Sequence, residues 1–372
     1  MKFSCTKENL FQALTLTSAI AGKSVNLPIL SNVLIKASAQ KVEICATNLE
    51  LAIVVNVRSK VETEGSFTVP ARTLSEFVGL LPDERIDLEL MENEMSIVCG
   101  KSSTKIKGVP AEDFPVIPTA MDGKGYLVSA SIFEKGLSQV LSSVARTDIR
   151  PELAGVFFGF NLEAGQLVLA ATDSYRLAEK KIALLQGAEE LKAILPGRAA
   201  QEIVHIISAL RDGAEKDARV LVGESQFVLN FGNIQMISRL TDGQYPDYTQ
   251  IIPKNFKTTA ELMVQPLIKE IKAASLFTTA GVNSVSLDIN SSQGTIGISS
   301  TSNQMGEYSS EAVAEITGEE NSILLNHKYV LDGLANMGSE KLILKMVGAE
   351  NPCVFTPAGD ESYLYIVMPI RQ

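Results

Sequence analysis

Four side chains that could take part in chemistry lie close together in the stretch ATDSYRLA, residues 171–178, between two runs of apolar residues. Asp173 could act as a general base, with Ser174, Tyr175 and Arg176 beside it. An aspartate in a short turn commonly accepts hydrogen bonds from the backbone of its own loop. We therefore interpret Asp173 as a residue that caps its turn, and the stretch as a polar loop held beside an apolar surface.

Other candidate catalytic motifs in the sequence are incomplete. The stretches AGKS (21–24) and CGKS (99–102) resemble the end of a phosphate-binding loop, but the first glycine of that motif is replaced by Thr17 and Met95. The chain has two histidines, and one of them, His205, lies among isoleucines. The nucleophile elbow of serine hydrolases and the zinc-protease helix motif do not occur in the sequence. The sequence therefore predicts a protein that is not an enzyme.

The cysteines also argue against a metal or disulfide framework. The chain has four cysteines and no C-x-x-C pair. Such spacing is typical of small core residues in a reducing compartment. We expect no metal, no cofactor and a cytoplasmic protein. The four are Cys5, Cys45, Cys99 and Cys353.

The first residues offer an alternative, a secretory signal ending at the A-I-A of residues 19–21. Lys7 and Glu8 interrupt the apolar run that a signal needs, and apolar residues there recur at helical spacing behind Thr6. The stretch favours an amphipathic helix capped by Thr6. The sequence contains no run of 18 apolar residues, so no membrane span is expected.

The chain contains an internal three-fold repeat. A strand followed by a turn (ICATNLELAI, LAATDSYRLA, GISSTSNQMGE), a strand running into a helix, and a strand ending before a proline each recur every 123 to 131 residues. Three landmarks with one period indicate three tandem domains. The landmarks are Thr47, Thr172 and Thr301; Pro70, Pro196 and Asn326; and Phe114-Pro115, Tyr245-Pro246 and Met368-Pro369.

Each repeat contains the pattern of two helices and several antiparallel strands. Apolar residues at helical spacing predict helices over 7–23, 72–81, 129–146, 197–211, 264–278 and 326–337. Between the helices, runs such as SVSLDI and KLILKM alternate with a period of two, as in strands with one buried face. The expected fold class is α+β, with three tandem repeats of a two-helix, antiparallel-sheet domain.

Charge is distributed unevenly between these expected helices and the rest of the chain. The six ranges hold ten basic and six acidic residues, a net +4, so the remainder carries −14 of the total of −10. Helices favour lysine and arginine in general, which is one explanation. The other is that the helices line one surface that faces a polyanion, while acidic sheets face outward.

The motifs LPILSNVLI (27–35), ATDSYRLA (171–178), SRLTDGQYPDY (238–248) and YIVMPIRQ (365–372) resemble those of the bacterial sliding clamp family, the beta subunit of DNA polymerase III. The resemblance covers the whole chain. It implies the DNA clamp fold, with domains at 1–122, 128–250 and 253–372. It further implies a head-to-tail homodimer that closes a six-domain ring, with helices lining the hole around duplex DNA and no chemistry of its own.

The resemblance also implies a hydrophobic cleft that binds short peptides of partner proteins beside the turn 171–178. Tyr175 stands where many members have histidine, and Gln250 where many have arginine, so the rim is less basic. Met368 and Pro369 are expected to end a strand and to leave the last three residues free. Carried over by motif, the cleft comprises Leu153, Thr172, Ser174, Tyr175, Arg176, Leu177, Pro246, Val282, Asn326, Tyr329, Val367, Met368, Pro369, Ile370 and Arg371.

Two further surfaces follow from the resemblance. DNA would face basic residues with no sequence preference, and the dimer would form where the third domain meets the partner's first domain. The expected DNA-facing residues are Lys23, Arg72, Arg146, Arg150 and Arg198. The expected interface residues are Leu276, Phe277, Lys105 and Ile106.

The implied partners are double-stranded DNA, the catalytic subunit of DNA polymerase III, the clamp loader, and other polymerases and repair proteins with clamp-binding peptides. Two alternatives stay open at this stage, a peptide-binding scaffold that does not act on DNA and an enzyme of unrecognised type. Loading onto circular DNA favours the clamp, while turnover that depends on Asp173 would favour an enzyme.

Overall fold

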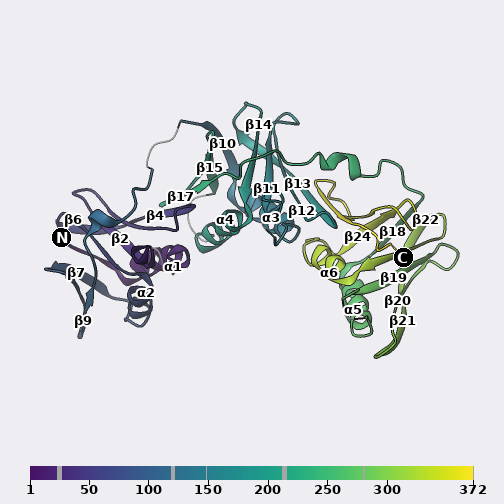
Figure 1. Cartoon of the computed structure of the whole chain (residues 1–372), viewed down its shortest axis with the longest axis horizontal. Coiled ribbons are helices and arrows are strands. Elements are labelled where there is room, and N and C mark those ends of the chain that lie inside the picture. Colours follow the sequence, from purple (N-terminus) through teal and green to yellow (C-terminus); the bar gives the residue numbers. More distant parts are fainter. Residues whose placement is uncertain (23–26, 119–121, 148, 212–215, 280, 372) are drawn as a thin grey trace. The chain divides into compact units, whose positions relative to one another are not determined.

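The fold was described from a computed structural model that covers residues 1–22, 27–118, 122–147, 149–211, 216–279 and 281–371 (Figure 1). In this part of the chain the helices occur where the periodicity predicts them. They are α1 (Lys7–Ile20), α2 (Ala71–Gly79), α3 (Ala130–Leu141), α4 (Gly197–Ala209), α5 (Val264–Ser275) and α6 (His327–Ala335).

Side chains at the helix ends explain where two of these helices begin. Thr6 precedes α1 and its hydroxyl accepts a hydrogen bond from the Asn9 amide at 3.4 Å, which confirms the predicted cap. Asn326 precedes α6, and its Oδ1 accepts from the Lys328 amide at 3.0 Å. Asn326 is therefore the cap of α6 rather than its first residue.

The helices end earlier than expected, and this changes the charge argument. Arg146 and Arg211 lie beyond the ends of α3 and α4, and Lys23 is outside the described residues. With the observed bounds the six helices hold seven basic and six acidic residues, a net charge of +1. The expected helical excess of +4 was wrong, because Arg146 and Arg211 follow the helices.

The strands repeat the same pattern three times, in agreement with the predicted α+β class. The first repeat has β1 (Lys2–Thr6), β2 (Asn32–Ala37), β3 (Val42–Thr47), β4 (Leu51–Val57), β5 (Ser59–Thr63), β6 (Gly65–Pro70), β7 (Arg85–Met91), β8 (Glu94–Cys99) and β9 (Ser102–Lys107). The second has β10 (Lys124–Ser129), β11 (Gly155–Phe160), β12 (Gln166–Thr172), β13 (Arg176–Gln186), β14 (Leu191–Pro196), β15 (Asp217–Val222), β16 (Gln226–Phe231) and β17 (Ile234–Arg239). The third has β18 (Thr258–Met263), β19 (Ser284–Asn290), β20 (Thr295–Ser302), β21 (Gly306–Val313), β22 (Glu315–Gly318), β23 (Asn321–Asn326), β24 (Lys341–Met346), β25 (Cys353–Pro357) and β26 (Tyr363–Val367).

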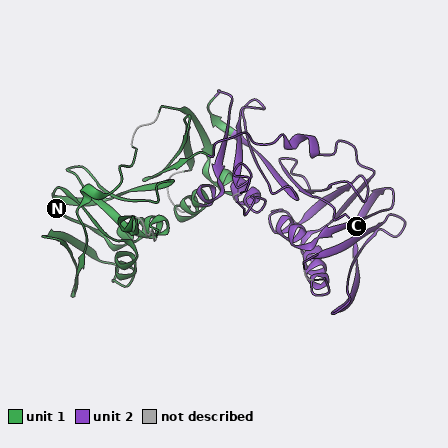
Figure 2. Cartoon of the chain, in the orientation of Figure 1, with its two compact units in different colours: residues 1–134, 184–187, 202–240 green, residues 135–183, 188–201, 241–372 purple. Residues whose placement is uncertain are grey.

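The chain divides into two compact units, coloured separately in Figure 2. Unit 1 comprises residues 1–134, 184–187 and 202–240. Its main sheet is antiparallel in the order β6-β2-β3-β4-β17-β16-β15-β10, so the second repeat joins the first through the pairing of β4 with β17. A core that includes Leu34, Val54, Phe114 and Ile237 packs across this junction.

Unit 2 comprises residues 135–183, 188–201 and 241–372. Its main sheet has the order β14-β11-β12-β13-β26-β25-β24-β18, and β13 pairs with β26 as β4 pairs with β17 in unit 1. Phe157, Leu177, Tyr245 and Ile366 belong to the core at this junction. The same strand pairing therefore joins consecutive repeats in both units.

Helix α6 approaches this sheet closely through a glycine. A Cβ atom on Gly333 would lie 2.2 Å from Cε1 of Tyr365 in β26, so only glycine fits there. The Tyr365 hydroxyl donates a hydrogen bond to the Tyr329 carbonyl at 2.7 Å. These two contacts fix α6 against the middle of β26. None of the helices in the described ranges is long and apolar enough to cross a membrane.

Candidate functional site

The turn between β12 and β13 is built by its own side chains. The Thr172 hydroxyl donates to the Arg176 carbonyl at 2.7 Å and accepts from the Ser174 amide at 3.1 Å. Asp173 Oδ1 accepts from the amides of Tyr175 and Arg176 at 3.0 and 3.1 Å. Ser174 has a φ of 77°, the left-handed conformation that such turns require. The interpretation of Asp173 as a turn cap is confirmed.

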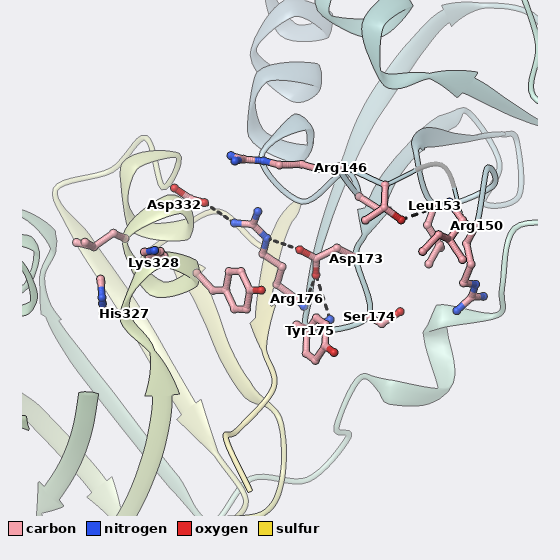
Figure 3. A pocket seen from close by; sticks show the side chains of 15 residues that line it. Arg146, Arg150, Leu153, Asp173, Ser174, Tyr175, Arg176, His327, Lys328 and Asp332 are labelled. Atoms are coloured by element: carbon pink, nitrogen blue, oxygen red, sulfur yellow. Dashed lines mark hydrogen bonds and ion pairs between the residues drawn. The ribbon is translucent and has the colours of Figure 1, made fainter. Parts of the chain in front are cut away.

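Arg176, the first residue of β13, is buried with 4% of its surface exposed. Its Nε donates to Asp173 Oδ2 at 3.0 Å, and its Nη1 donates to Asp332 Oδ2 on α6 (Figure 3). Burial alone would lower the pKa of Arg176, but Tyr365 and the carboxylates of Asp332 and Asp173 outweigh it and raise the pKa. The guanidinium is therefore charged and held in one orientation.

Two tyrosines stand beside this ion-pair network. The rings of Tyr175 and Tyr329 stack with centroids 6.3 Å apart and planes 18° apart. The Arg176 guanidinium lies 4.7 Å from the Tyr329 ring centroid, within the range of a cation–π interaction. Tyr175 is 63% exposed, so its ring offers apolar surface to a ligand.

These groups border a pocket of about 630 Å³ (Figure 3). Its walls come from the segment after α3, the turn before β13 and the first half of α6. An open pocket of this size with apolar walls and a few fixed polar groups suits a peptide side chain or a small ligand. The lining residues are Ala145, Arg146, Thr147, Ile149, Arg150, Leu153, Asp173, Ser174, Tyr175, Arg176, His327, Lys328, Tyr329, Leu331 and Asp332.

Family models of the three domains of the DNA polymerase III beta subunit match almost the whole chain. The N-terminal domain model matches residues 1–118, the central domain model 127–247 and the C-terminal domain model 249–371. The chain belongs to the DNA polymerase III beta subunit family. The expected three-domain clamp fold is thereby confirmed, and the family is not one of enzymes.

Individual relatives agree with this family over their full length. The "Beta sliding clamp" of Staphylococcus aureus (strain Mu50 / ATCC 700699) is 26% identical over 381 residues, which are 100% of this chain and 99% of the relative. The corresponding protein of Synechococcus elongatus is 28% identical over 376 residues, with the same coverage.

Solved structures of the family have the same fold. The crystal structure of the DNA polymerase sliding clamp from Bacillus subtilis matches with a TM-score of 0.93 and 27% identity, over 100% of this chain and 99% of that one. The DNA polymerase III beta subunit from Thermotoga maritima matches with a TM-score of 0.93 and 28% identity, over the same shares of the two chains.

Five residues of the expected peptide cleft line the pocket, namely Leu153, Ser174, Tyr175, Arg176 and Tyr329. The other ten expected cleft residues do not line it. Thr172, Leu177 and Val367 are buried within the chain, so they support the site rather than offer free surface. Those that do not line the pocket are Thr172, Leu177, Pro246, Val282, Asn326, Val367, Met368, Pro369, Ile370 and Arg371.

The C-terminal tail is held in place rather than free. β26 pairs with β13, with Val367 opposite Arg176. The Met368 amide then donates to the Tyr175 carbonyl at 2.9 Å, and the Ile370 amide donates to the Leu324 carbonyl at 2.8 Å. The expectation that the last residues are free was wrong for Ile370, because β23 provides an acceptor for its amide.

Tyr245 has a different role from the one that the repeat suggested. β17 ends at Arg239, so Tyr245 does not end a strand as Met368 does after β26. Its buried hydroxyl accepts a hydrogen bond from the Thr172 amide at 3.0 Å. Sequence reasoning missed this contact, although the aromatic stretch QYPDY was a signal that the segment packs on something.

The expected DNA-facing residues lie in both units and differ in their local contacts. Arg146 and Arg150 line the pocket with Tyr175, and Arg150 pairs with Glu152 at 3.0 Å. Arg72 pairs with Glu76 on α2 at 2.7 Å. Arg198 is exposed on α4, while Lys23 lies outside the described residues. The pocket therefore combines residues that the sequence had assigned to two different surfaces.

The expected dimer residues differ in exposure. Leu276 is 67% exposed just after α5, and Lys105 is exposed on β9, which lies at the edge of its sheet. Phe277 stacks on Tyr308 of the same chain, with centroids 6.0 Å apart. Ile106 is 8% exposed and already buried in its own sheet, so it is a poor candidate for an interface anchor.

Within the described ranges there is no cluster of three or more residues that could hold a metal ion. The four cysteines are buried as free thiols. Burial raises the pKa of Cys45 to about 12, which keeps the thiol protonated and unreactive at neutral pH.

Proposed function

We propose that the chain is a DNA sliding clamp, a processivity factor that encircles duplex DNA and tethers DNA polymerase III and other replication and repair proteins. The match of all three family models in order is the observation that carries this proposal. The proposed domains are 1–122, 128–250 and 253–372, and the proposed location is the cytoplasm.

In this proposal two chains associate head to tail and close into a ring. A head-to-tail contact between unlike surfaces gives a closed ring only when its rotation closes. Leu276, exposed after α5, and the edge strand β9 with Lys105 support an interface of this kind. An edge strand with lysines avoids random pairing but accepts a complementary edge.

The ring would hold DNA by its topology rather than by strong contacts. A chain with a net charge of −10 attracts phosphates weakly, and a sequence-independent contact allows sliding. Arg72, Arg146, Arg150, Arg198 and Lys23 are proposed to face DNA. Loss of Arg198, Lys23 and Arg146 together is expected to slow loading, most clearly at low salt.

The peptide site is proposed to lie around the turn 171–178 and the C-terminal tail. Exposed Tyr175 and half-buried Met368 can receive apolar anchors of partner peptides, and methionine adapts to varied shapes. The catalytic subunit of DNA polymerase III and the clamp loader are the proposed partners.

Retention on DNA of different topology tests the clamp proposal. After loading with ATP and a clamp loader, the protein should stay on nicked circular DNA and slide off once the circle is cut. Light scattering should give the molar mass of a dimer. Leu276→Ala with Phe277→Ala should give folded monomers that are not retained, while Val116→Ala, at a side chain that is 94% exposed, should change neither result. A monomeric wild type without retention would contradict the proposal.

A further inference from the structure

Strand β21 corresponds in the repeat to β4 and β13, but its outer edge is unpaired in the part of the chain that the structure describes. Each of these strands follows one that ends at or next to Thr47, Thr172 or Thr301. β4 pairs with β17 and β13 with β26, and these pairings join consecutive repeats. β21 pairs with β20 and lies at the edge of its sheet (Figure 1). An added strand at this edge would continue the pattern.

The inner face of β21 is tied to α5 by one tyrosine. The Tyr308 hydroxyl donates a hydrogen bond to Glu270 Oε2 on α5 at 2.6 Å. This hydrogen bond lowers the pKa of Glu270, so its carboxylate is charged at neutral pH. A hydrogen bond to a charged acceptor is stronger than one between neutral groups. The bond therefore fixes the edge strand against the helix.

The ring of Tyr308 also supports Phe277, which follows the end of α5. The two rings stack with centroids 6.0 Å apart and planes 11° apart. Both side chains are only half-buried, and Leu276, the neighbour of Phe277 in the chain, is 67% exposed. Tyr308 thus connects the unpaired edge strand with one of the two apolar side chains proposed to meet a second copy of the chain.

The hydrogen bond from Tyr308 is not needed to hold α5 on its sheet. The Ser300 hydroxyl on β20 donates to the Ala274 carbonyl in the last turn of α5 at 2.7 Å. Ser300 is buried, so this contact is protected from water. The end of α5 is therefore anchored to β20 independently, and the Tyr308 hydroxyl adds order to β21 and to Phe277.

We propose that Tyr308 and Glu270 are positioning residues that hold Phe277 and the edge of β21 ready to associate with a second copy of the chain. This inference rests on the proposed head-to-tail ring. β9 of the second copy would pair with β21 as β17 pairs with β4. Groups that are ordered before association lose less conformational entropy when they bind. The hydrogen bond should therefore slow dissociation of the dimer without being an interface contact itself.

Subunit exchange measures this effect. Full-length chains labelled separately with a donor or an acceptor dye are mixed, and energy transfer reports exchange between dimers. Tyr308→Phe keeps the ring that stacks on Phe277 and removes only the hydroxyl, so exchange should become about tenfold faster. Glu270→Ala should have the same effect. Glu270→Gln, which keeps an acceptor oxygen, should change the rate less than about twofold.

Two further variants separate positioning from a general loss of stability. Tyr308→Phe combined with Glu270→Ala should exchange no faster than either single variant, because both remove the same bond. Tyr248→Phe is the matched control. The Tyr248 hydroxyl donates to Glu179 Oε2 at 2.7 Å in the same unit, and Glu179 lies on β13, in a different sheet from β21. This variant should exchange at the wild-type rate.

The outcomes distinguish the inference from the proposed ring. If the wild-type chains are monomeric by light scattering and show no energy transfer after mixing, the ring fails and the inference fails with it. If the wild type is dimeric but Tyr308→Phe exchanges at its rate, only the inference is overturned. It is likewise overturned if Tyr248→Phe accelerates exchange equally, or if the effects of Tyr308→Phe and Glu270→Ala add.

Discussion

The junction of β4 with β17 in unit 1 and that of β13 with β26 in unit 2 are built alike. In the turn before β4, the Thr47 hydroxyl donates to the Leu51 carbonyl at 3.0 Å and accepts from the Leu49 amide at 3.0 Å. Thr172, Arg176 and Ser174 repeat these contacts before β13. Leu49 and Ser174 both have a φ of 77°. One turn design therefore starts both junctions.

The hydrogen bonds between the joined repeats also correspond. The Arg239 amide donates to the Glu50 carbonyl at 2.9 Å, as the Met368 amide does to Tyr175 at 2.9 Å. At the other end of the junction in unit 1, the Asn56 amide donates to the Asn233 carbonyl at 2.9 Å. In unit 2, the Lys181 amide donates to the Ser362 carbonyl at 2.8 Å in the same way. The backbone of the two junctions is equivalent, although the side chains are not.

The difference between the junctions lies in a few side chains. Buried Leu51 in unit 1 corresponds to buried Arg176 in unit 2, and Glu50 corresponds to Tyr175. Arg176 needs Asp332 as a partner, and Tyr175 needs Tyr329. A repeat thus keeps its architecture through local hydrogen bonds, and a binding site arises where charged and aromatic residues replace neutral ones on the same backbone.

Replacing the buried residue at each turn should give the largest difference. Arg176→Met leaves Asp173 and Asp332 without their cation, and loss of one partner of a buried ion pair costs about 3 kcal/mol. Leu51→Met replaces one apolar side chain by another and should cost less than about 1.5 kcal/mol. Hydrogen exchange of the peptides that contain each turn measures both local free energies of unfolding. Equal losses of local free energy of unfolding in the two variants would contradict the expectation that Arg176 depends on its ion pairs more than Leu51 depends on its packing.

The residues that follow the two last strands should differ in peptide binding. Met368→Ala should weaken binding of a labelled clamp-binding peptide about thirtyfold, which corresponds to about 2 kcal/mol, because it truncates a central apolar anchor site. Removing residues 368–372 should abolish binding. Arg239→Ala, at the equivalent backbone position of unit 1, should leave the affinity unchanged. Unchanged affinity after the truncation would exclude the tail from the peptide site.

The shared turn predicts equal effects in the two units. Thr47→Val and Thr172→Val each remove a hydroxyl that donates to one backbone group and accepts from another. Each should destabilise its junction by about 1.5 kcal/mol. Chemical denaturation with hydrogen exchange compares the two values. A loss confined to Thr172→Val would mean that the two turns are not energetically equivalent.

The smallest expected difference between the two junctions is in how their stability depends on pH. Lys180 pairs with Asp360 at 3.0 Å beside β26, whereas the corresponding positions in unit 1 are occupied by the apolar residues Val55 and Phe231. Burial alone would raise the pKa of Asp360, but hydrogen bonds from Ser362 and Lys180 outweigh it and lower the pKa from 3.8 to about 2.

A carboxylate whose pKa is lower in the folded than in the unfolded state stabilises the fold at every pH above its unfolded-state pKa. This stabilisation is lost as the pH falls through its folded-state pKa. The contribution of Asp360 should therefore be complete at pH 5 and disappear between about pH 4 and pH 2. Its side chain is 37% exposed, so solvent screening reduces the effect to about 1 kcal/mol. Hydrogen exchange of β26 should show this loss of stability at low pH, and that of β17 should not. In the Asp360→Asn variant the pH dependence of β26 should be absent.

Much of the fold was predictable because its signals are local. The helices follow from apolar residues three and four positions apart, and Thr6 caps α1 through a contact three residues away. The ends of the helices were less predictable, so the basic excess assigned to them disappeared once Arg146 and Arg211 were found beyond the helices. The family motifs placed Tyr175, Arg176 and Tyr329 in a binding site, but not Asp332, the partner of Arg176 on α6.

By itself the sequence determined the repeat, the type of each element and the turn at Thr172, because the hydrogen bonds of that turn join residues within five positions of each other. Only the tertiary structure decided that Asp332, 156 residues further along, neutralises Arg176 at the edge of the pocket. Whether a charge is satisfied depends on which groups from distant segments come within reach of it.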